Sequence, residues 1–396
     1  MSSDARGCGV SGGRLARGAG LALPLLASAL GVVAQEEIVV PDDPAQPCVI
    51  EFIPTGPELG GGAAGVLDDT WPSQVAEIEL VDEGRIAMVE LISDRFFVAY
   101  RDGTGGRWVG RGGEGPGEYS FARWVRPAGD RLHVFDPIRM RRTVLDATTL
   151  EVVRTNPLPI HFLADALVLD DSSYLINGAI YTKESVGYVL HLFNGEGEVV
   201  RSFDEIPVVM PGEEPIRGDS RWLAPARDGV WSAWRSEYRL DLWDAASGTL
   251  RRTLVRHVPW FPPHNGWGGD WHPDRPADPV IADIMEDSDE RLWVLVLVAS
   301  DRWPECWVKQ APSAHPEAPE YTPRPGCPRF ERRLEVLDPG AGRVLAAQTL
   351  PSNFWLRRLT AGEAFSLEED EFGLAKVRQW RPALRPVNDS QGGRKC

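Results

Sequence analysis

The sequence lacks the short motifs that most often identify an enzyme or a nucleotide-binding protein. It contains no C-x-x-C pair, no phosphate-binding G-x-x-x-x-G-K-[ST] and no zinc-binding H-E-x-x-H. Its one G-x-S-x-G, at residues 9–13, lies in the N-terminal leader described below and is discarded as a nucleophile motif. Long apolar runs are also missing beyond that leader, since the longest, residues 292–299, has only the length of a strand. We therefore expect no membrane span in the rest of the chain.

Positive charge is in short supply. The chain has 42 Lys and Arg against 58 Asp and Glu, which gives a formal net charge of −16. A strongly acidic protein repels phosphate backbones, so we expect no nucleic-acid partner. Helix signals are scarce as well, because 33 Pro and 40 Gly are spread along the chain and no window keeps a 3.6-residue period. With 43% hydrophobic residues, the composition indicates a globular all-β protein.

The first 34 residues have the features of a secretory signal peptide. Three arginines form a basic segment before the apolar stretch 18–33, and small residues precede a cleavage point after Ala34. A retained membrane anchor is the alternative, but the stretch is short for a span and contains Pro24. We therefore expect an exported protein, periplasmic or extracellular. Removal of the leader would change the net charge from −16 to −18, because it takes away three Arg and one Asp.

Four cysteines follow the leader: Cys48, Cys306, Cys327 and Cys396. An even number in an exported protein suggests disulfides rather than a metal site. Cys306 and Cys327 bracket a Pro-rich insertion, residues 300–329, which would be poorly ordered without a crosslink. We therefore predict a Cys306–Cys327 disulfide. A Cys48–Cys396 pair follows only if the two ends of the chain meet.

The main signal is an internal repeat of six units. In each unit a tight polar turn leads into an alternating or apolar strand. The six stretches are GRIAMV (84–89), DRLHVF (130–135), SSYLIN (172–177), GVWSAW (229–234), ERLWVL (290–295) and EAFSLE (363–368). A second hairpin follows in five of the units, where Asp or Asn precedes a turn, as in YRDG (100–103) and FNG (193–195). Each unit is thus a four-stranded antiparallel meander, and six of them predict a six-bladed β-propeller.

The sixth unit is one strand short. After residues 364–367 and 373–380 the chain enters Arg381-Pro382 and a polar tail, while residues 49–53 form a strand with no partner of their own. We predict that 49–53 pairs with 373–380 as the outer strand of the sixth blade, which closes the ring and covers sheet edges. A two-sheet sandwich is the alternative architecture, but its strands need not recur in fours. The predicted organisation is leader 1–34, N-terminal extension with closing strand 35–70, six-bladed propeller 71–381 and polar C-terminal tail 382–396.

The glycine-rich segment carries a family resemblance. GRGGEGPGEY (110–119), followed by LHVFD (132–136), resembles the G-x-G-E-G-P-G-E-[FY] signature of bacterial six-bladed β-propellers related to NHL repeats. The Asp-Gly-Arg-Leu-Trp-Val pattern of that family is echoed by DERLWV (289–294). The resemblance covers roughly residues 70 to 380. It implies the fold and little chemistry, because the family resembled is largely uncharacterised.

Topology decides which loops can form a site. In an up-and-down blade, the turns between strands one and two and between strands three and four lie on one face. The loops between strands two and three and the crossings between blades lie on the other, which we call the long-loop face. The long segments 110–119, 207–220, 258–280 and 300–329 all belong to this face. Long loops on a rigid scaffold are where binding sites usually lie.

The glycine segment 110–119 also matches the dinucleotide fingerprint G-x-G-x-x-G. That fingerprint must open a helix, and Pro116-Gly117 does not, so we reject nucleotide binding. We interpret the segment as a blade-to-blade crossing that needs close backbone approach. Glu118 is the one charged group there that could point into the channel.

The segment 258–280 is the most unusual stretch of the chain. It combines aromatic rings and imidazoles with carboxylates, which suits sugar, peptide or cationic ligands. The candidate ligand-binding residues are Glu118, Trp260, His264, Trp267, Asp270, Trp271 and His272. The spacing of His264 and His272 fits no standard zinc motif, so we assign no metal ligands. The alternative is a loop that covers the core with its own aromatic side chains.

Two functions of different class remain. The first is a non-catalytic binding or scaffold module, a monomer without a cofactor, that recognises a protein, peptide or glycan on the long-loop face. The second is a metal-dependent hydrolase or lactonase resembling the gluconolactonases, with a divalent metal over the central channel. The carboxylates near predicted crossings or inner-strand starts, which this alternative would use, are Glu118, Asp165, Asp219, Asp270 and Asp283. We favour binding, because no compact triad is visible and a fold does not dictate a function, and we leave catalysis open.

Overall fold

The computed structural model describes residues 36–42, 46–60, 71–72, 75–91, 93–182, 184–206, 220–264, 272–310, 320–351, 354–369, 375–387 and 396. The predicted leader lies outside these residues, as do Asp219, Trp267, Asp270 and Trp271. In the described part of the chain, no helix has the length and apolar character needed to span a membrane.

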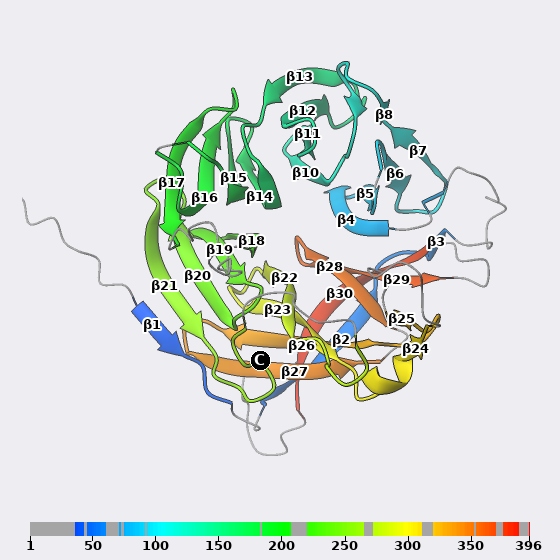
Figure 1. Cartoon of the computed structure of the whole chain (residues 1–396), viewed down its shortest axis with the longest axis vertical. Coiled ribbons are helices and arrows are strands. Elements are labelled where there is room, and N and C mark those ends of the chain that lie inside the picture. Colours follow the sequence, from blue (N-terminus) through cyan, green and yellow to red (C-terminus); the bar gives the residue numbers. More distant parts are fainter. Residues whose placement is uncertain are drawn as a thin grey trace, which may run out of the picture. The chain divides into compact units, whose positions relative to one another are not determined.

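The described strands form six blades that follow one another around a ring (Figure 1). Blade 1 consists of β4 (Val75–Asp82), β5 (Arg85–Glu90), β6 (Phe96–Tyr100) and β7 (Gly106–Val109). Blade 2 consists of β10 (Trp124–Ala128), β11 (Arg131–Asp136), β12 (Arg141–Asp146) and β13 (Val152–Pro157). Blade 3 consists of β14 (Phe162–Asp170), β15 (Ser173–Ala179), β16 (Tyr188–Asn194) and β17 (Val199–Glu205).

The second half of the ring continues the same order of strands. Blade 4 consists of β18 (Arg221–Ala226), β19 (Gly229–Trp234), β20 (Arg239–Asp244) and β21 (Thr249–Val255). Blade 5 consists of β22 (Val280–Glu286), β23 (Leu292–Ala299), β26 (Phe330–Asp338) and β27 (Arg343–Leu350). Blade 6 consists of β28 (Trp355–Thr360), β29 (Glu363–Glu369), β30 (Ala375–Pro386) and, from the N-terminal part, β2 (Cys48–Pro54). The predicted six-bladed β-propeller is confirmed.

Turn chemistry explains why the chain reverses where it does. At the ends of several strands an Asp or Asn side chain accepts hydrogen bonds from the backbone of the next turn. Asp82 accepts from the N–H of Gly84 (2.9 Å), and Asp146 accepts from that of Thr148 (3.0 Å). Such local bonds favour turns over continued strand, which is why these residues mark the repeat in the sequence.

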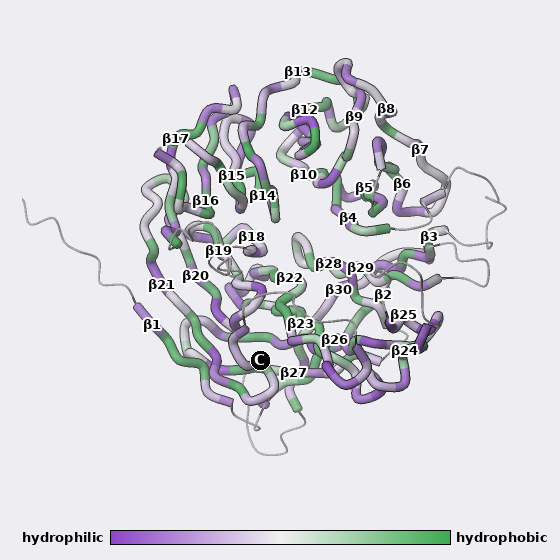
Figure 2. The backbone as a smooth tube through the Cα atoms, in the orientation of Figure 1, coloured by the Kyte–Doolittle hydropathy of each residue, from purple (hydrophilic) through white to green (hydrophobic). Residues whose placement is uncertain are grey.

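The hydrophobic core lies between blades. The middle strands are buried in continuous runs, such as 86–89 of β5 and 292–296 of β23, because each blade packs between two others. In Figure 2 these strands contain green stretches, the colour of hydrophobic residues. In the described chain the core divides into six clusters, and each joins two neighbouring blades. The cluster between blades 6 and 1 includes Phe365 and Ile78, so packing closes the ring.

The N-terminal part supplies the outer strand of blade 6, as predicted, but in a different register. β2 pairs antiparallel with β30, and Cys48 lies opposite Pro386. The paired residues of β30 are 380–386 and not the predicted 373–380. The strand continues through Pro382 because this part of β30 extends beyond β29 and pairs with β2 alone among the described strands. On the side away from β2 there is no described strand to which the missing backbone N–H of proline would have donated a hydrogen bond. The short strand β3 (Leu59–Gly60) pairs with the first half of β30.

The segment before β2 follows the outer edges of three blades. β1 (Glu36–Val39) pairs in parallel with β21 of blade 4 (Figure 1). Gln46 then accepts a hydrogen bond from the backbone of Ala347 on blade 5 (2.7 Å), and β2 completes blade 6. A Cys48–Cys396 disulfide joins this strand to the C-terminal residue. The segment therefore covers strand edges that would otherwise be open to pairing with other chains.

The insertion of blade 5 is crosslinked as predicted. Between β23 and β26 it contains a 3-10 helix (Trp303–Cys306) and the strands β24 (Trp307–Lys309) and β25 (Tyr321–Pro323). The Cys306–Cys327 disulfide ties the two arms together. Trp303 packs edge-on against Trp307 and Phe330, so a small aromatic core supports the insertion.

Candidate functional site

Buried charged side chains fill the space between the inner strands. Arg126 of β10 donates hydrogen bonds to Glu77 of β4 (2.5 Å), to Asp165 of β14 (2.8 Å) and to the carbonyl of Ala166 (2.8 Å). The second oxygen of Asp165 accepts from the backbone N–H of Leu223 on β18 (2.8 Å). This half of the network joins blades 1 to 4.

A second arginine joins the remaining blades. Arg358 of β28 donates to Asp283 of β22 (2.7 Å) and to Glu79 of β4 (2.6 Å). Asp283 also accepts from the backbone of Leu359 (2.6 Å). Burial raises the pKa of Glu79, but Arg358 and Arg126 outweigh burial and lower it below its usual value. Burial raises the pKa of Asp283 to about 6, although Arg358 opposes that shift.

A β-bulge recurs at the start of four inner strands. The register shifts between residues 75 and 77, 163 and 165, 281 and 283, and 356 and 358. In each case the residue after the shift, Glu77, Asp165, Asp283 or Arg358, belongs to the charged network. The residue that each bulge skips is Ala in three strands (Ala76, Ala164 and Ala282) and Arg357 in the fourth. Bulges re-aim side chains, and here they turn one charged group inward per strand.

The network bears on the carboxylates considered for a channel metal. Asp165 and Asp283 are buried, and their oxygens already accept bonds from arginine and from backbone N–H groups. Asp219 and Asp270 lie outside the described residues. Among the residues that the structure describes, no group of three His, Cys, Asp or Glu side chains is placed to hold a metal ion.

Trp260 and His264 anchor their own segment. Trp260 is partly buried, packs edge-on against Phe261 and carries the guanidinium of Arg333 over its ring (4.3 Å). His264 donates through Nε2 to the carbonyl of Pro279 (2.7 Å), which closes the loop at its base. These contacts are those of a loop that covers the core, and the ligand role proposed for these residues from sequence stays a prediction.

His272 and Glu118 also contact residues near them. The ring of His272 lies edge-on to Tyr321 of the insertion (4.7 Å). Glu118 forms an ion pair with Arg111 (2.7 Å) and accepts from the backbone N–H of Gly115 (2.8 Å). The Gly115 bond and Arg111 lower the pKa of Glu118. The four described candidates are therefore held by contacts with different neighbours.

The long-loop face has a recess of about 820 Å³ that the sequence did not reveal. Its walls come from the inner ends of blades 1 and 6 and from the second arm of the blade 5 insertion. We call it the arginine recess. Its lining residues are Val75, Ala76, Leu91, Pro323, Arg324, Pro325, Gly326, Cys327, Pro328, Arg329, Phe330, Trp355, Arg357, Leu367, Glu368 and Ala375.

Charge in the recess is opposite to that of the whole chain. Three arginines line it against one glutamate, Glu368, which is already paired with Arg378 (3.2 Å). Arg324 is exposed, and no carboxylate pairs with it among the described residues. Part of the Arg357 side chain is exposed to solvent, and its guanidinium donates one bond to the Ala76 carbonyl where it is partly buried. Burial lowers the pKa of Arg357, although Glu77 attracts its charge.

An aromatic side chain lies beside these arginines. Trp355 is 47% exposed, and the guanidinium of Arg332 lies over its ring at 4.4 Å. Burial and the nearby charge of Arg357 lower the pKa of Arg332 to about 10. The recess thus joins an indole ring, apolar walls and an excess of guanidinium groups.

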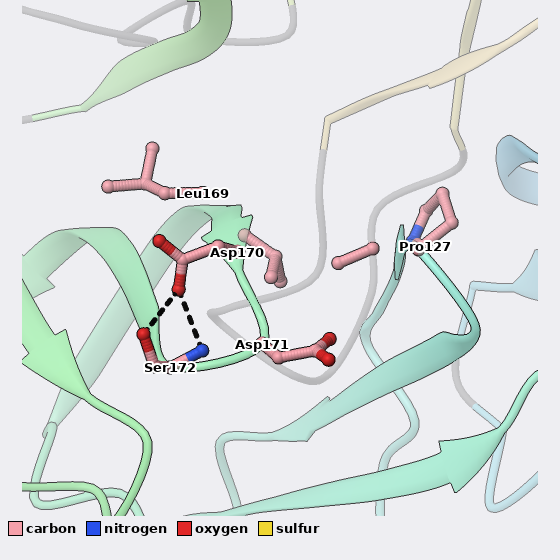
Figure 3. A pocket seen from close by; sticks show the side chains of 8 residues that line it. Pro127, Leu169, Asp170, Asp171 and Ser172 are labelled. Carbon is pink, nitrogen blue, oxygen red and sulfur yellow. Dashed lines mark hydrogen bonds between the residues drawn. The ribbon is translucent and has the colours of Figure 1, made fainter.

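A second recess of about 590 Å³ lies on the opposite face, between the inner turns of blades 2 and 3 (Figure 3). Asp170 accepts from both the N–H and the hydroxyl of Ser172 (2.7 Å each), so it serves its own turn. The carboxylate of Asp171 extends into the space between the two turns. The polar atoms here belong to tight hairpins, and we assign this recess no function.

Solved structures similar to this chain share little of its sequence. A predicted exported protein from Bacteroides fragilis matches with a TM-score of 0.55 at 11% identity, over 89% of this chain and 100% of that one. Kuenenia stuttgartiensis hydrazine synthase matches with a TM-score of 0.41 at 11% identity, over 78% of this chain and 80% of that one. The WD40 β-propeller domain of Doa1 matches with a TM-score of 0.41 at 14% identity, over 83% and 96%. No protein-family model and no curated protein matches. The Bacteroides likeness shows the fold alone.

One sequence signal for the site was missed. The pattern of an apolar residue, Ala and an acid occurs at 75–77, 163–165 and 281–283, and LRR replaces it at 356–358. An arginine in place of the repeated alanine marks Arg357 as different from its counterparts. Nothing comparable in the sequence marks Trp355 or Arg324, because only the folded insertion brings Arg324 to blade 6.

Proposed function

We propose that this chain is an exported, non-catalytic binding propeller that recognises a protein, peptide or glycan in the arginine recess of its long-loop face. The observation that carries the proposal is the recess itself. Its volume of about 820 Å³ lies within the range of roughly 300 to 1,000 Å³ usual for ligand sites. Apolar walls with a few convergent polar groups are the usual composition of such sites.

The axis of the ring supports binding over catalysis. The buried carboxylates there accept hydrogen bonds from Arg126, Arg358 and backbone N–H groups. A carboxylate held in this way stabilises the ring and is poorly placed to activate a water or to bind a metal.

The proposal includes export of the chain and its relation to the NHL-repeat-like propellers. Two disulfides fit an oxidising compartment, in agreement with the predicted leader. The glycine signature at 110–119 supports a place among the NHL-repeat-like six-bladed propellers. Mass spectrometry of the exported protein should find residue 35 at its N-terminus, whereas an intact Met1 on cytosolic protein would contradict export.

The test uses two bulky substitutions on the same face. Ligands would be selected on the purified protein from a peptide display library and a glycan array. Leu91→Trp places an indole in the recess, and Ile138→Trp places one on a loop of blade 2. The two original side chains are comparably exposed, at 54% and 63%. We expect Leu91→Trp to abolish binding and Ile138→Trp to preserve it. Equal binding by both variants would show that the recess is not the site.

A further inference from the structure

We infer that the arginine recess takes a peptide segment in which a carboxylate side chain stands beside an apolar one. The carboxylate lies against Arg357 and Arg324, and the apolar side chain lies against Trp355. This inference rests on the proposed function and narrows its ligand from a protein, peptide or glycan to an acidic, apolar peptide segment.

The balance of donors and acceptors favours a peptide over a sugar. Sugar hydroxyls both donate and accept, so their sites offer carboxylate or amide oxygens as well as N–H groups. Within the described lining, Glu368 is the one side-chain carboxylate or amide acceptor, and its charge is paired with that of Arg378. The guanidinium groups can only donate, and a carboxylate can only accept. The recess therefore matches a carboxylate.

Charge complementarity points the same way. Arg357 spends one N–H on the Ala76 carbonyl and keeps other N–H groups for a ligand. A planar guanidinium suits two parallel bonds to a carboxylate. Burial of part of the Arg357 side chain disfavours its charge and lowers its pKa, and a bound anion would offset that cost.

The exposed apolar side chains in the walls of the recess indicate that the ligand also has an apolar part. Trp355 presents a half-exposed ring, and Leu91 is 54% exposed at the rim. Exposed apolar side chains gathered in one hollow, with polar groups at the rim, are typical of protein-binding sites. An acidic residue flanked by Leu, Ile, Phe or Trp would fill both halves of the recess.

Arg357 can be removed with little risk to the fold. The bulges of β4, β14 and β22 carry alanine at the matching position, so Arg357→Ala restores the residue that three other blades use. Arg324→Ala changes an exposed side chain on the insertion. The matched control is Arg227→Ala with Arg302→Ala, which removes two exposed arginines outside the recess.

The experiment is a selection of random linear peptides on the purified full chain, followed by titration of the selected peptides. We expect enrichment of Asp or Glu beside an apolar residue. The Arg324→Ala/Arg357→Ala variant should bind about tenfold to a hundredfold more weakly, the range expected for lost charge-assisted hydrogen bonds. The control variant should bind as the unchanged protein does, and added salt should weaken binding. Equal melting temperatures of the three proteins would show that the effect is local.

The outcomes separate this inference from the proposed function. Peptides blocked by Leu91→Trp but without acidic enrichment, or insensitive to the loss of Arg324 and Arg357, would overturn the inference and leave the proposed function standing. Binding of oligogalacturonate with the same arginine dependence, and no peptide binding, would replace the peptide by an acidic glycan and overturn the inference. If no ligand of any class is sensitive to Leu91→Trp, the proposed function fails as well.

Discussion

Removing Arg358 should destabilise the propeller at the axis of its ring. The side chain bridges Asp283 at 2.7 Å and Glu79 at 2.6 Å, and both carboxylates are nearly inaccessible, at 2% and 4% exposure. Arg358→Met keeps an apolar chain of similar length and leaves two buried acids without this partner. Glu79 retains Arg126 at 3.3 Å, so the loss falls mainly on Asp283.

The expected cost is about 3 to 5 kcal/mol in the free energy of unfolding at pH 8, as for other buried pairs that lose one partner. Acid should reduce that cost. Burial already raises the pKa of Asp283 to about 6 with Arg358 present, and loss of the cation raises it further. A carboxyl whose pKa is higher in the folded than in the unfolded state favours folding as protons bind. The gap between variant and unchanged protein should therefore narrow from pH 8 to pH 5.

Urea unfolding at several pH values measures both effects, with the slope m as a check on two-state behaviour. Arg227→Met is the control, because Arg227 forms an exposed ion pair with Glu290 on the surface. It should leave the unfolding midpoint unchanged. A loss below about 1 kcal/mol in Arg358→Met, or a loss that does not change with pH, would refute the account of the axis.

Three further predictions concern closure, crosslinking and acid. Deleting residues 36–54 removes β1 and β2, so the variant should aggregate or melt at a much lower temperature; an unchanged melting temperature would show that blade 6 is stable with three strands. Replacing Cys306 and Cys327 by serine should lower the free energy of unfolding by about 3 kcal/mol in a denaturant titration. Equal stability of the unchanged protein with and without reductant would contradict this. Burial lowers the pKa of His133 to about 3 and of His191 to about 4, so the unfolded chain, with histidine near 6.5, takes up protons first. The stability that these two histidines contribute should be full above pH 6.5 and fall toward pH 4 by about 1.4 kcal/mol per unit for each histidine, and protonation of Asp283 below about pH 6 opposes part of that fall. His133→Leu should flatten the pH curve of melting by one histidine's share, and an unchanged slope would count against the assignment.

The fold could be predicted from the sequence because its signals are local and repeated. Six polar turns before apolar strands, and one orphan strand near the N-terminus, are enough to specify six blades and their closure. The register of closure could not be predicted in the same way. Pro382 looked like the end of a strand, and only the tertiary arrangement shows that its missing N–H faces no partner.

The site was harder to predict because it depends on how neighbouring residues are aimed. Asp165 and Asp283 were expected near the channel and lie at the axis, but their partners Arg126 and Arg358 come from other blades. Arg357 and Arg358 are adjacent in sequence, and one lines the recess while the other is buried at the axis. A β-bulge between Leu356 and Arg358 determines which of the two arginines faces the axis. The alternation of inward and outward side chains along a regular strand does not predict the position of that bulge.

Photo-crosslinking of a selected peptide tests the central claim most directly. The peptide would carry a photoreactive residue next to its acidic one, and mass spectrometry would locate the crosslinks on the chain. The account predicts crosslinks within 323–330 and at Trp355 and Arg357, which line the arginine recess. Crosslinks concentrated in 258–280, or on the inner turns at 127–129 and 169–172 of the opposite face, would contradict it.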